Sequence, residues 1–217
     1  ETYKNDKSQP RLKFVTPENY FKILERQKPD LPSFVRELNF TFPACYTTQA
    51  ETKKNNRRAE ALLVTAEKFS ALAVAAGFRD YYPERDIDEA WKVVLRNQFH
   101  DILDGSSIGP VYDEVRGFYR TAMDRGQRAL DFSLETITNG IDTRGDGLPL
   151  VVYNPLAWDR TEPVVCDVPR SGKTGTVRLL DPQGAEVPCQ IIPTPVRTGS
   201  SPLRIVFVAE AVPSFGY

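Results

Sequence analysis

The sequence is poor in the residues that build self-contained metal sites and disulfide frameworks. Its 217 residues include one histidine, His100, and three scattered cysteines, Cys45, Cys166 and Cys189. A protein zinc site needs about three or four ligands, and a disulfide scaffold needs a denser, paired set of cysteines. We therefore expect no zinc site formed by this chain alone. The cysteines favour reduced thiols in a reducing compartment.

The chain also lacks a charge excess and a long apolar run. Its 28 basic and 29 acidic residues give a net charge of −1, which leaves no electrostatic footprint for nucleic acid or anionic membranes. No apolar stretch approaches the roughly 20 residues that cross a bilayer. There is no glycine-rich phosphate loop and no nucleophile elbow. We therefore expect neither nucleic acid nor a membrane as a partner.

Amphipathic periodicity predicts three long helices. The first covers about 49–76, the second runs from Asp86 or Asp88 to about Ile102, and the third runs from Ser107 or Pro110 to about Thr138. Their apolar residues recur at steps of three and four, the spacing of one buried face. These predicted stripes are Leu62, Ala66, Phe69 and Ala73; Trp91, Val94, Leu95 and Ile102; and Val111, Val115, Phe118, Ala122, Ala129 and Phe132. Short connections favour an antiparallel three-helix bundle.

The character of the sequence changes at both ends of these helices. Thr16 and Pro17 predict an earlier short helix that reaches about Gln27. After a linker at 142–147, Val- and Ile-rich runs at 150–153, 162–168, 176–180, 187–192 and 203–209 predict strands, with a turn at 181–184. The predicted fold class is therefore α+β and multidomain: an antiparallel three-helix bundle over 49–141, followed by a small antiparallel β-sandwich-like domain over 148–217.

The segment with the most chemistry is 97–108, Asn-Gln-Phe-His-Asp-Ile-Leu-Asp-Gly-Ser-Ser-Ile. It places the His100 imidazole beside the Asp101 carboxylate, at the end of a predicted helix that Gly105 breaks. An imidazole is a common metal ligand, but a histidine at this position also fits a partly buried side chain that is hydrogen-bonded within the bundle. Position alone leaves both interpretations open.

The same segment closely resembles the middle-domain signature of family 38 glycoside hydrolases, the α-mannosidases. Three further segments are similar to this family and keep its order: Cys-Tyr-Thr-Thr-Gln-Ala at 45–50, Asn-Arg-Arg-Ala-Glu-Ala-Leu-Leu at 56–63, and Val-Tyr-Asn-Pro-Leu-Ala-Trp at 152–158. The sequence departs from the pattern at Asp104, where proline is expected. This change lies beyond His100 and bears only on the loop that follows.

The resemblance implies an internal part of a metal-dependent, retaining α-mannosidase. Residues 1–48 would be the tail of the catalytic α/β barrel and a connector, and 148–217 a truncated first β domain. In this family one divalent metal ion, typically zinc, is held by barrel residues and one middle-domain histidine. His100 matches that metal ligand, Asp101 matches the neighbouring catalytic acid, and Tyr46 is the implied substrate-binding residue.

The resemblance also implies partners and a location. The substrate would be a mannose-containing saccharide, and the second partner would be the catalytic barrel domain of the same protein. The family's nucleophilic aspartate lies upstream of this segment, so we expect the isolated chain to be inactive. The form of the 97–101 segment is more similar to cytoplasmic or bacterial members, which favours a cytoplasmic location.

Several features of the sequence are open to more than one interpretation. The basic run at 53–58 is either a solvated helix face or, through Arg57 or Arg58, a docking surface for barrel carboxylates. Phe40 and Phe42, with Tyr46, either pack between domains or stack on a sugar, and Asn39 begins a formal glycosylation triplet. The rival function is a non-catalytic carbohydrate-binding or interdomain scaffolding module.

Overall fold

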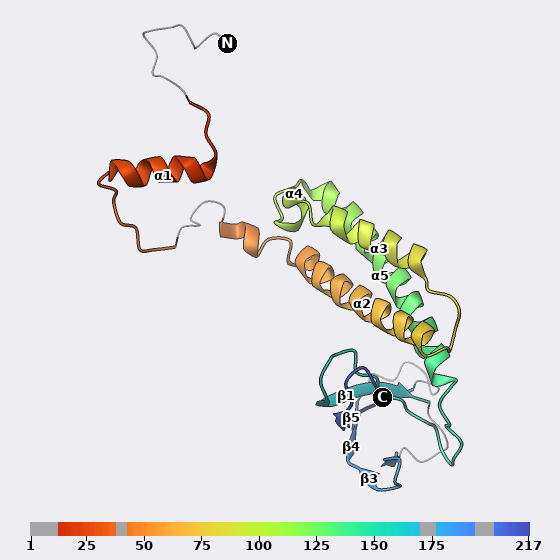
Figure 1. Ribbon diagram of the computed structural model, residues 1–217. Helices are drawn as coiled ribbons and strands as arrows, with labels where there is room; N and C mark the ends of the chain where they lie inside the picture. Colours follow the sequence, from red (N-terminus) through yellow and green to blue (C-terminus); the bar gives the residue numbers. More distant parts are fainter. Residues whose placement is uncertain (1–12, 38–42, 170–176, 194–201) are drawn as a thin grey trace, which may run out of the picture. The chain divides into compact units, whose positions relative to one another are not determined.

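A computed structural model of the chain describes residues 13–37, 43–169, 177–193 and 202–217, in two compact units, Glu1–Pro43 and Ala44–Tyr217 (Figure 1). In the first unit, helix α1 (Pro17–Gln27) has the predicted ends. The Thr16 hydroxyl accepts a hydrogen bond from the Asn19 N–H, and Lys28 ends the helix with φ 43°. No residue of α1 is buried within the described part of the chain.

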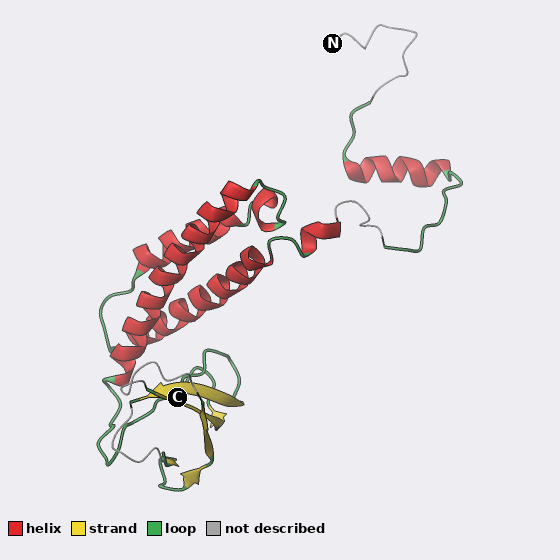
Figure 2. Cartoon of the chain, turned by 180° about the vertical axis from the view of Figure 1, so that it is seen from behind, coloured by secondary structure: helices red, strands yellow, loops and turns green. Residues whose placement is uncertain are grey.

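Three long helices of the second unit lie side by side (Figures 1 and 2). They are α2 (Ala50–Ala75), α3 (Glu84–Asn97) and α5 (Gly109–Thr138), preceded by the 3₁₀ turn η1 (Pro43–Tyr46). Leu63 of α2, Val94 of α3 and Tyr119 of α5 share one core cluster and are fully buried. Gly77 closes α2: it has φ 74°, and the N–H groups of Gly77 and Phe78 donate to carbonyl oxygens of the last turn of the helix.

Burial along the helices differs from the predicted stripes at several positions. Leu63 is buried where Leu62 was expected, and it packs against a glycine of α5: a Cβ built on Gly126 would lie 2.7 Å from Leu63 Cδ2. Leu95 is 59% exposed and Phe132 is 54% exposed. Phe132 instead lies under the guanidinium of Arg79, 4.5 Å from its ring centroid, so tertiary neighbours decide its role.

The prediction of one continuous helix to Ile102 is wrong. Helix α3 ends at Asn97, and Phe99 adopts an extended backbone conformation with φ −53° and ψ 138°. A separate single turn, α4 (His100–Leu103), follows. His100 therefore begins a short turn of its own instead of ending a long helix. Gly105 follows this turn with φ 93°.

The β part contains two small antiparallel sheets among the described residues. Strands β1 (Arg160–Val168), β5 (Leu203–Val212) and β4 (Cys189–Ile192) form one sheet in the order β1-β5-β4, with Ile205 and Phe207 buried. Strands β2 (Leu179–Leu180) and β3 (Glu186–Val187) pair around the predicted turn, in which Gly184 has φ 85°. The α+β class is confirmed. The bundle and sandwich descriptions stay predictions.

The strand predicted at 150–153 does not form. Its last residue, Tyr153, instead anchors the β part on the helices: the ring lies 5.4 Å from that of Phe69, and the hydroxyl is 2.7 Å from Thr138 Oγ1. Asn154 is buried, and its Nδ2 donates to three carbonyl oxygens, including that of Trp158 at 2.7 Å. The Val-Tyr-Asn-Pro segment is therefore a structural joint.

Candidate functional site

The His100 side chain is open to solvent. It is 80% exposed, and its Nε2 lies 3.8 Å from Asp101 Oδ2. The imidazole ring lies 4.2 Å from the ring of Phe99, tilted by 50°. The alternative of a partly buried histidine that is hydrogen-bonded within the bundle is therefore wrong. The ring is accessible to a group outside the described residues.

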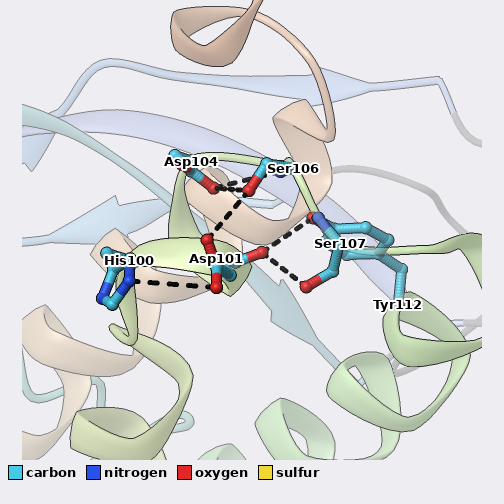
Figure 3. A network of polar contacts seen from close by, with 6 residues as sticks. All are labelled: His100, Asp101, Asp104, Ser106, Ser107 and Tyr112. Carbon is cyan, nitrogen blue, oxygen red and sulfur yellow. Dashed lines mark hydrogen bonds and ion pairs between the residues drawn. The ribbon is translucent and has the colours of Figure 1, made fainter.

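Asp101 lies at the centre of a polar network that shapes the loop after α4 (Figure 3). Its backbone carbonyl accepts from Ser107 Oγ at 2.5 Å and from the Tyr112 hydroxyl at 3.5 Å, while Tyr112 accepts from the Ser107 N–H at 3.0 Å. Its carboxylate accepts a long bond of 3.3 Å from Ser106 Oγ and lies 3.8 Å from His100 Nε2, and the side chain is 57% exposed. The backbone is thus fixed while the carboxylate faces solvent.

Asp104, at the position where the resemblance led us to expect proline, has a local role. Its carboxylate Oδ1 accepts from the N–H and from the hydroxyl of Ser106, both at 3.0 Å. This is a side-chain turn of the kind that aspartate commonly forms with the backbone two residues on. The departure from the family pattern is accommodated within the loop and leaves His100 exposed.

The loop packs directly on the segment that precedes α2. A Cβ built on Gly105 would lie 2.3 Å from Thr48 Cγ2 and 3.1 Å from the Thr48 carbonyl oxygen. Lys53 Nζ donates to the Thr48 carbonyl at 2.8 Å and to the Asp104 carbonyl at 3.2 Å. Two segments that resemble the same family, 45–50 and 97–108, are therefore in contact.

A second set of hydrogen bonds holds the residue Gln98, which precedes α4 in the chain. Gln98 Nε2 donates to Asn56 Oδ1 at 3.1 Å and to Glu60 Oε1 at 2.8 Å. The buried Tyr119 hydroxyl donates to the same Asn56 oxygen at 3.3 Å. Burial, and then the charge of Glu60, raises the pKa of Tyr119 to about 12, so this hydroxyl stays protonated as a donor at neutral pH.

These supporting residues were not predicted from the sequence. Lys53 and Asn56 were read as part of a solvated basic run, but Lys53 is half-buried and Asn56 is 5% exposed. A signal was present, because Thr52, Asn56, Ala59 and Leu63 follow one another at steps of four and three, the spacing of one buried face. The predicted apolar stripe began at Leu62 and did not extend back to these polar positions.

The other predicted residues lie around this loop or outside it. Tyr46 ends η1 and is 70% exposed. Arg57 pairs with Glu60 at 2.5 Å and is 81% exposed, and Arg58 is exposed. Phe40, Phe42 and Asn39 lie outside the described residues. The solvated-face interpretation holds for the two arginines, and their docking role stays a prediction.

The residues present supply part of a metal site. Across 13–37, 43–169, 177–193 and 202–217, no three His, Cys, Asp or Glu side chains gather closely enough to hold an ion. The exposed His100 imidazole offers one nitrogen donor with the chemistry that zinc accepts. A complete site would need about two or three more ligands from elsewhere.

Among the helices of the described residues, none has the length and apolar character that a membrane span requires.

Comparison with known sequences gives consistent matches. Residues 41–137 match the profile of the alpha mannosidase middle domain. The chain is 31% identical over 206 residues to human "Alpha-mannosidase 2C1", covering 93% of this chain and 19% of the relative. It is 40% identical over 152 residues to the "Alpha-mannosidase" of Saccharomyces cerevisiae, covering 68% of this chain and 14% of the relative. The chain thus spans less than a fifth of the length of either relative.

Comparison with solved structures supports the fold. A protein in glycosyl hydrolase family 38 from Enterococcus faecalis superposes with a TM-score of 0.67 at 23% identity, covering 93% of this chain and 27% of the other. An alpha-mannosidase from Enterococcus faecalis V583 gives 0.61 at 22% identity, covering 92% and 27%. At this level of identity the likeness concerns the fold alone.

Proposed function

The chain belongs to the family 38 α-mannosidases, and from this premise we propose that it forms the middle and first β portions of a retaining enzyme that hydrolyses terminal α-mannosides. The observation that carries the proposal is the exposed His100–Asp101 pair on a loop whose backbone is held from several sides. A side chain that is open to solvent and mounted on a fixed backbone suits a site completed by another domain.

His100 is proposed as one ligand of a divalent metal ion, with zinc as the expected metal. The neutral imidazole supplies the nitrogen donor, and its exposure leaves it free to reach an ion outside the described residues. The remaining ligands are assigned to the catalytic barrel domain of the same protein. When bound, the ion would polarise and position hydroxyl groups of the mannose.

Asp101 is proposed as a catalytic group beside that ligand. Its backbone is fixed by Ser107 and Tyr112 while its carboxylate is only weakly engaged, so the carboxylate is available to hydrogen-bond a sugar hydroxyl or to orient the imidazole. Tyr46 is proposed to stack on the apolar face of a pyranose, because its ring is largely exposed.

Retaining glycosidases use two carboxyl groups about 5–5.5 Å apart, one as nucleophile and one as acid/base. The nucleophile is assigned to the barrel domain, so the chain alone would be inactive.

A cytoplasmic location is also proposed, because Cys45, Cys166 and Cys189 are all free thiols, as expected in a reducing compartment.

The test assays both the intact parent protein and this chain with a chromogenic α-mannoside, and proton NMR identifies the anomer released. We expect the parent to release mannose with retained configuration and the chain to show no turnover. Turnover by the pure chain, or a parent that does not hydrolyse α-mannosides, would overturn the proposal. Titration of the chain with manno-oligosaccharides, with and without zinc, tests the rival: metal-independent binding by the β part would favour a carbohydrate-binding module.

A further inference from the structure

We propose that Lys53 is a positioning residue of this site. Its ammonium group holds the turn that begins with His100 against the segment that contains Tyr46. The inference rests on the proposed function and goes beyond it, because it assigns a role to a side chain whose hydrogen bonds go to backbone carbonyl oxygens. Its basis is the way one face of helix α2 holds both ends of the His100 turn.

The two hydrogen bonds of Lys53 join segments that are far apart in sequence. The acceptors are the carbonyl oxygens of Thr48, five residues before Lys53, and Asp104, 51 residues after it. Asp104 is the residue that ends α4, so its carbonyl marks the far end of the turn that His100 begins. The ammonium group has three N–H donors and no acceptor, and charge-assisted bonds from it are stronger than neutral ones.

The near end of the same turn is held by the next residues along α2. Gln98, two residues before His100, donates to Asn56 and Glu60. Lys53, Asn56 and Glu60 follow at steps of three and four and therefore share one face of the helix. Side chains on this face of α2 therefore hydrogen-bond to the chain both before His100 and after Leu103. Loss of Lys53 would release one end of the turn and leave the other held.

The contact between the two segments is close enough to couple them. Gly105 lies directly against Thr48, with no room for a side chain between them. Tyr46 is only two residues before Thr48, and Asp101 is three residues before Asp104. Movement at the Lys53 junction would therefore shift the proposed sugar-stacking ring relative to the proposed metal ligand and catalytic acid. Transition-state geometry is sensitive to displacements of about 1 Å.

The first experiment uses this chain and its single histidine. The chain has a single histidine, so the imidazole signals of its NMR spectrum arise from His100 and report any change in the conformation of the turn. In Lys53→Met we expect backbone order parameters at 100–104 to fall from about 0.85 to below about 0.6, with circular dichroism of the helices unchanged. Lys54→Met is the matched control, because Lys54 is the next residue of α2 and is exposed; it should leave the signals unchanged.

The second experiment uses the intact parent enzyme. We expect Lys53→Met to lower kcat/KM at least tenfold and to weaken metal retention against a chelator, with Lys53→Arg recovering part of the loss and Lys54→Met matching wild type. Equal behaviour of Lys53→Met and Lys54→Met in an active enzyme would overturn the inference alone, whereas a parent without α-mannosidase activity would overturn the proposed function. Unfolding of the Lys53→Met chain would also contradict the inference, because Lys53 would then stabilise the fold instead of positioning the site.

Discussion

Gly105→Ala is the substitution whose cost follows most directly from the structure of the His100 loop. Gly105 has φ 93°, a conformation that a non-glycine residue adopts at a cost of about 1–2 kcal/mol. The new Cβ would also lie 2.3 Å from Thr48 Cγ2, and forcing extra atoms into a packed contact costs about 1–3 kcal/mol. We expect Gly105→Ala to lower the free energy of unfolding by about 2–5 kcal/mol.

A second substitution separates the two contributions. Thr48→Ser removes the Cγ2 methyl group but keeps the hydroxyl, so Gly105→Ala in a Thr48→Ser background would lose the methyl overlap and keep the backbone strain. The double variant should therefore be about 1–3 kcal/mol more stable than the sum of the single effects predicts. Some cost would remain, because the Thr48 carbonyl oxygen also lies 3.1 Å from the built Cβ.

Urea denaturation of the four proteins, followed by circular dichroism at a helix-sensitive wavelength, measures each term. Thr48→Ser alone should be close to neutral. A Gly105→Ala chain as stable as wild type would contradict the contact between the loop and the Thr48 segment. Strictly additive effects of the two substitutions would assign the cost to backbone strain and the contact with the Thr48 carbonyl oxygen, and would refute the overlap with the Thr48 methyl group.

Three further predictions concern the same region. The pKa of Tyr119 is raised from 10.0 to about 12 in the folded chain. Its contribution to the free energy of unfolding is therefore fully present below pH 10 and is lost as the pH rises to 12, by about 1.4 kcal/mol per pH unit. Tyr119→Phe should remove this pH-dependent contribution, and parallel curves of stability against pH for the two proteins would contradict it. Charge reversal at Arg57 and Arg58 should leave the stability of this chain within about 0.5 kcal/mol but lower the activity of the intact enzyme; unchanged activity would exclude their docking role. Leu63→Ala should cost about 2–5 kcal/mol in a urea titration, because Leu63 is fully buried, whereas Leu95→Ala, at a 59% exposed position, should cost less than about 1 kcal/mol.

Local signals in the sequence were sufficient for the ends of several elements. Thr16 and Pro17 specify the start of α1, and Gly77 specifies the end of α2, because caps depend on a few neighbouring residues. The break between α3 and α4 was not predictable in this way. Gln98, which follows α3, bonds to Asn56 and Glu60 of another helix, and the spacing of residues along one helix does not predict a partner on another.

The same limit applies to the candidate site. His100 and Asp101 were assigned their roles from the resemblance of their segment to the family 38 signature, because their position alone left a partly buried histidine equally possible. The roles of Lys53 and Gly105 depend on a contact between residues about 50 positions apart, which the sequence pattern did not reveal. Residues 150–153 were predicted as a strand for a related reason: Val152 packs against the core of the sheet and Tyr153 packs on Phe69 of α2, and an apolar run alone does not distinguish such packing from a strand.

Metal binding by the intact parent enzyme tests the central claim most directly. Zinc affinity is measured by chelator competition for wild type, His100→Ala and the control Lys54→Met, with metal content determined by elemental analysis. We expect His100→Ala to bind zinc at least tenfold more weakly while the control matches wild type, since loss of a ligand should cost at least as much as the roughly 10–100-fold seen for its hydrogen-bonding partners. Wild-type zinc affinity in a folded His100→Ala enzyme would contradict the assignment of His100 as a metal ligand.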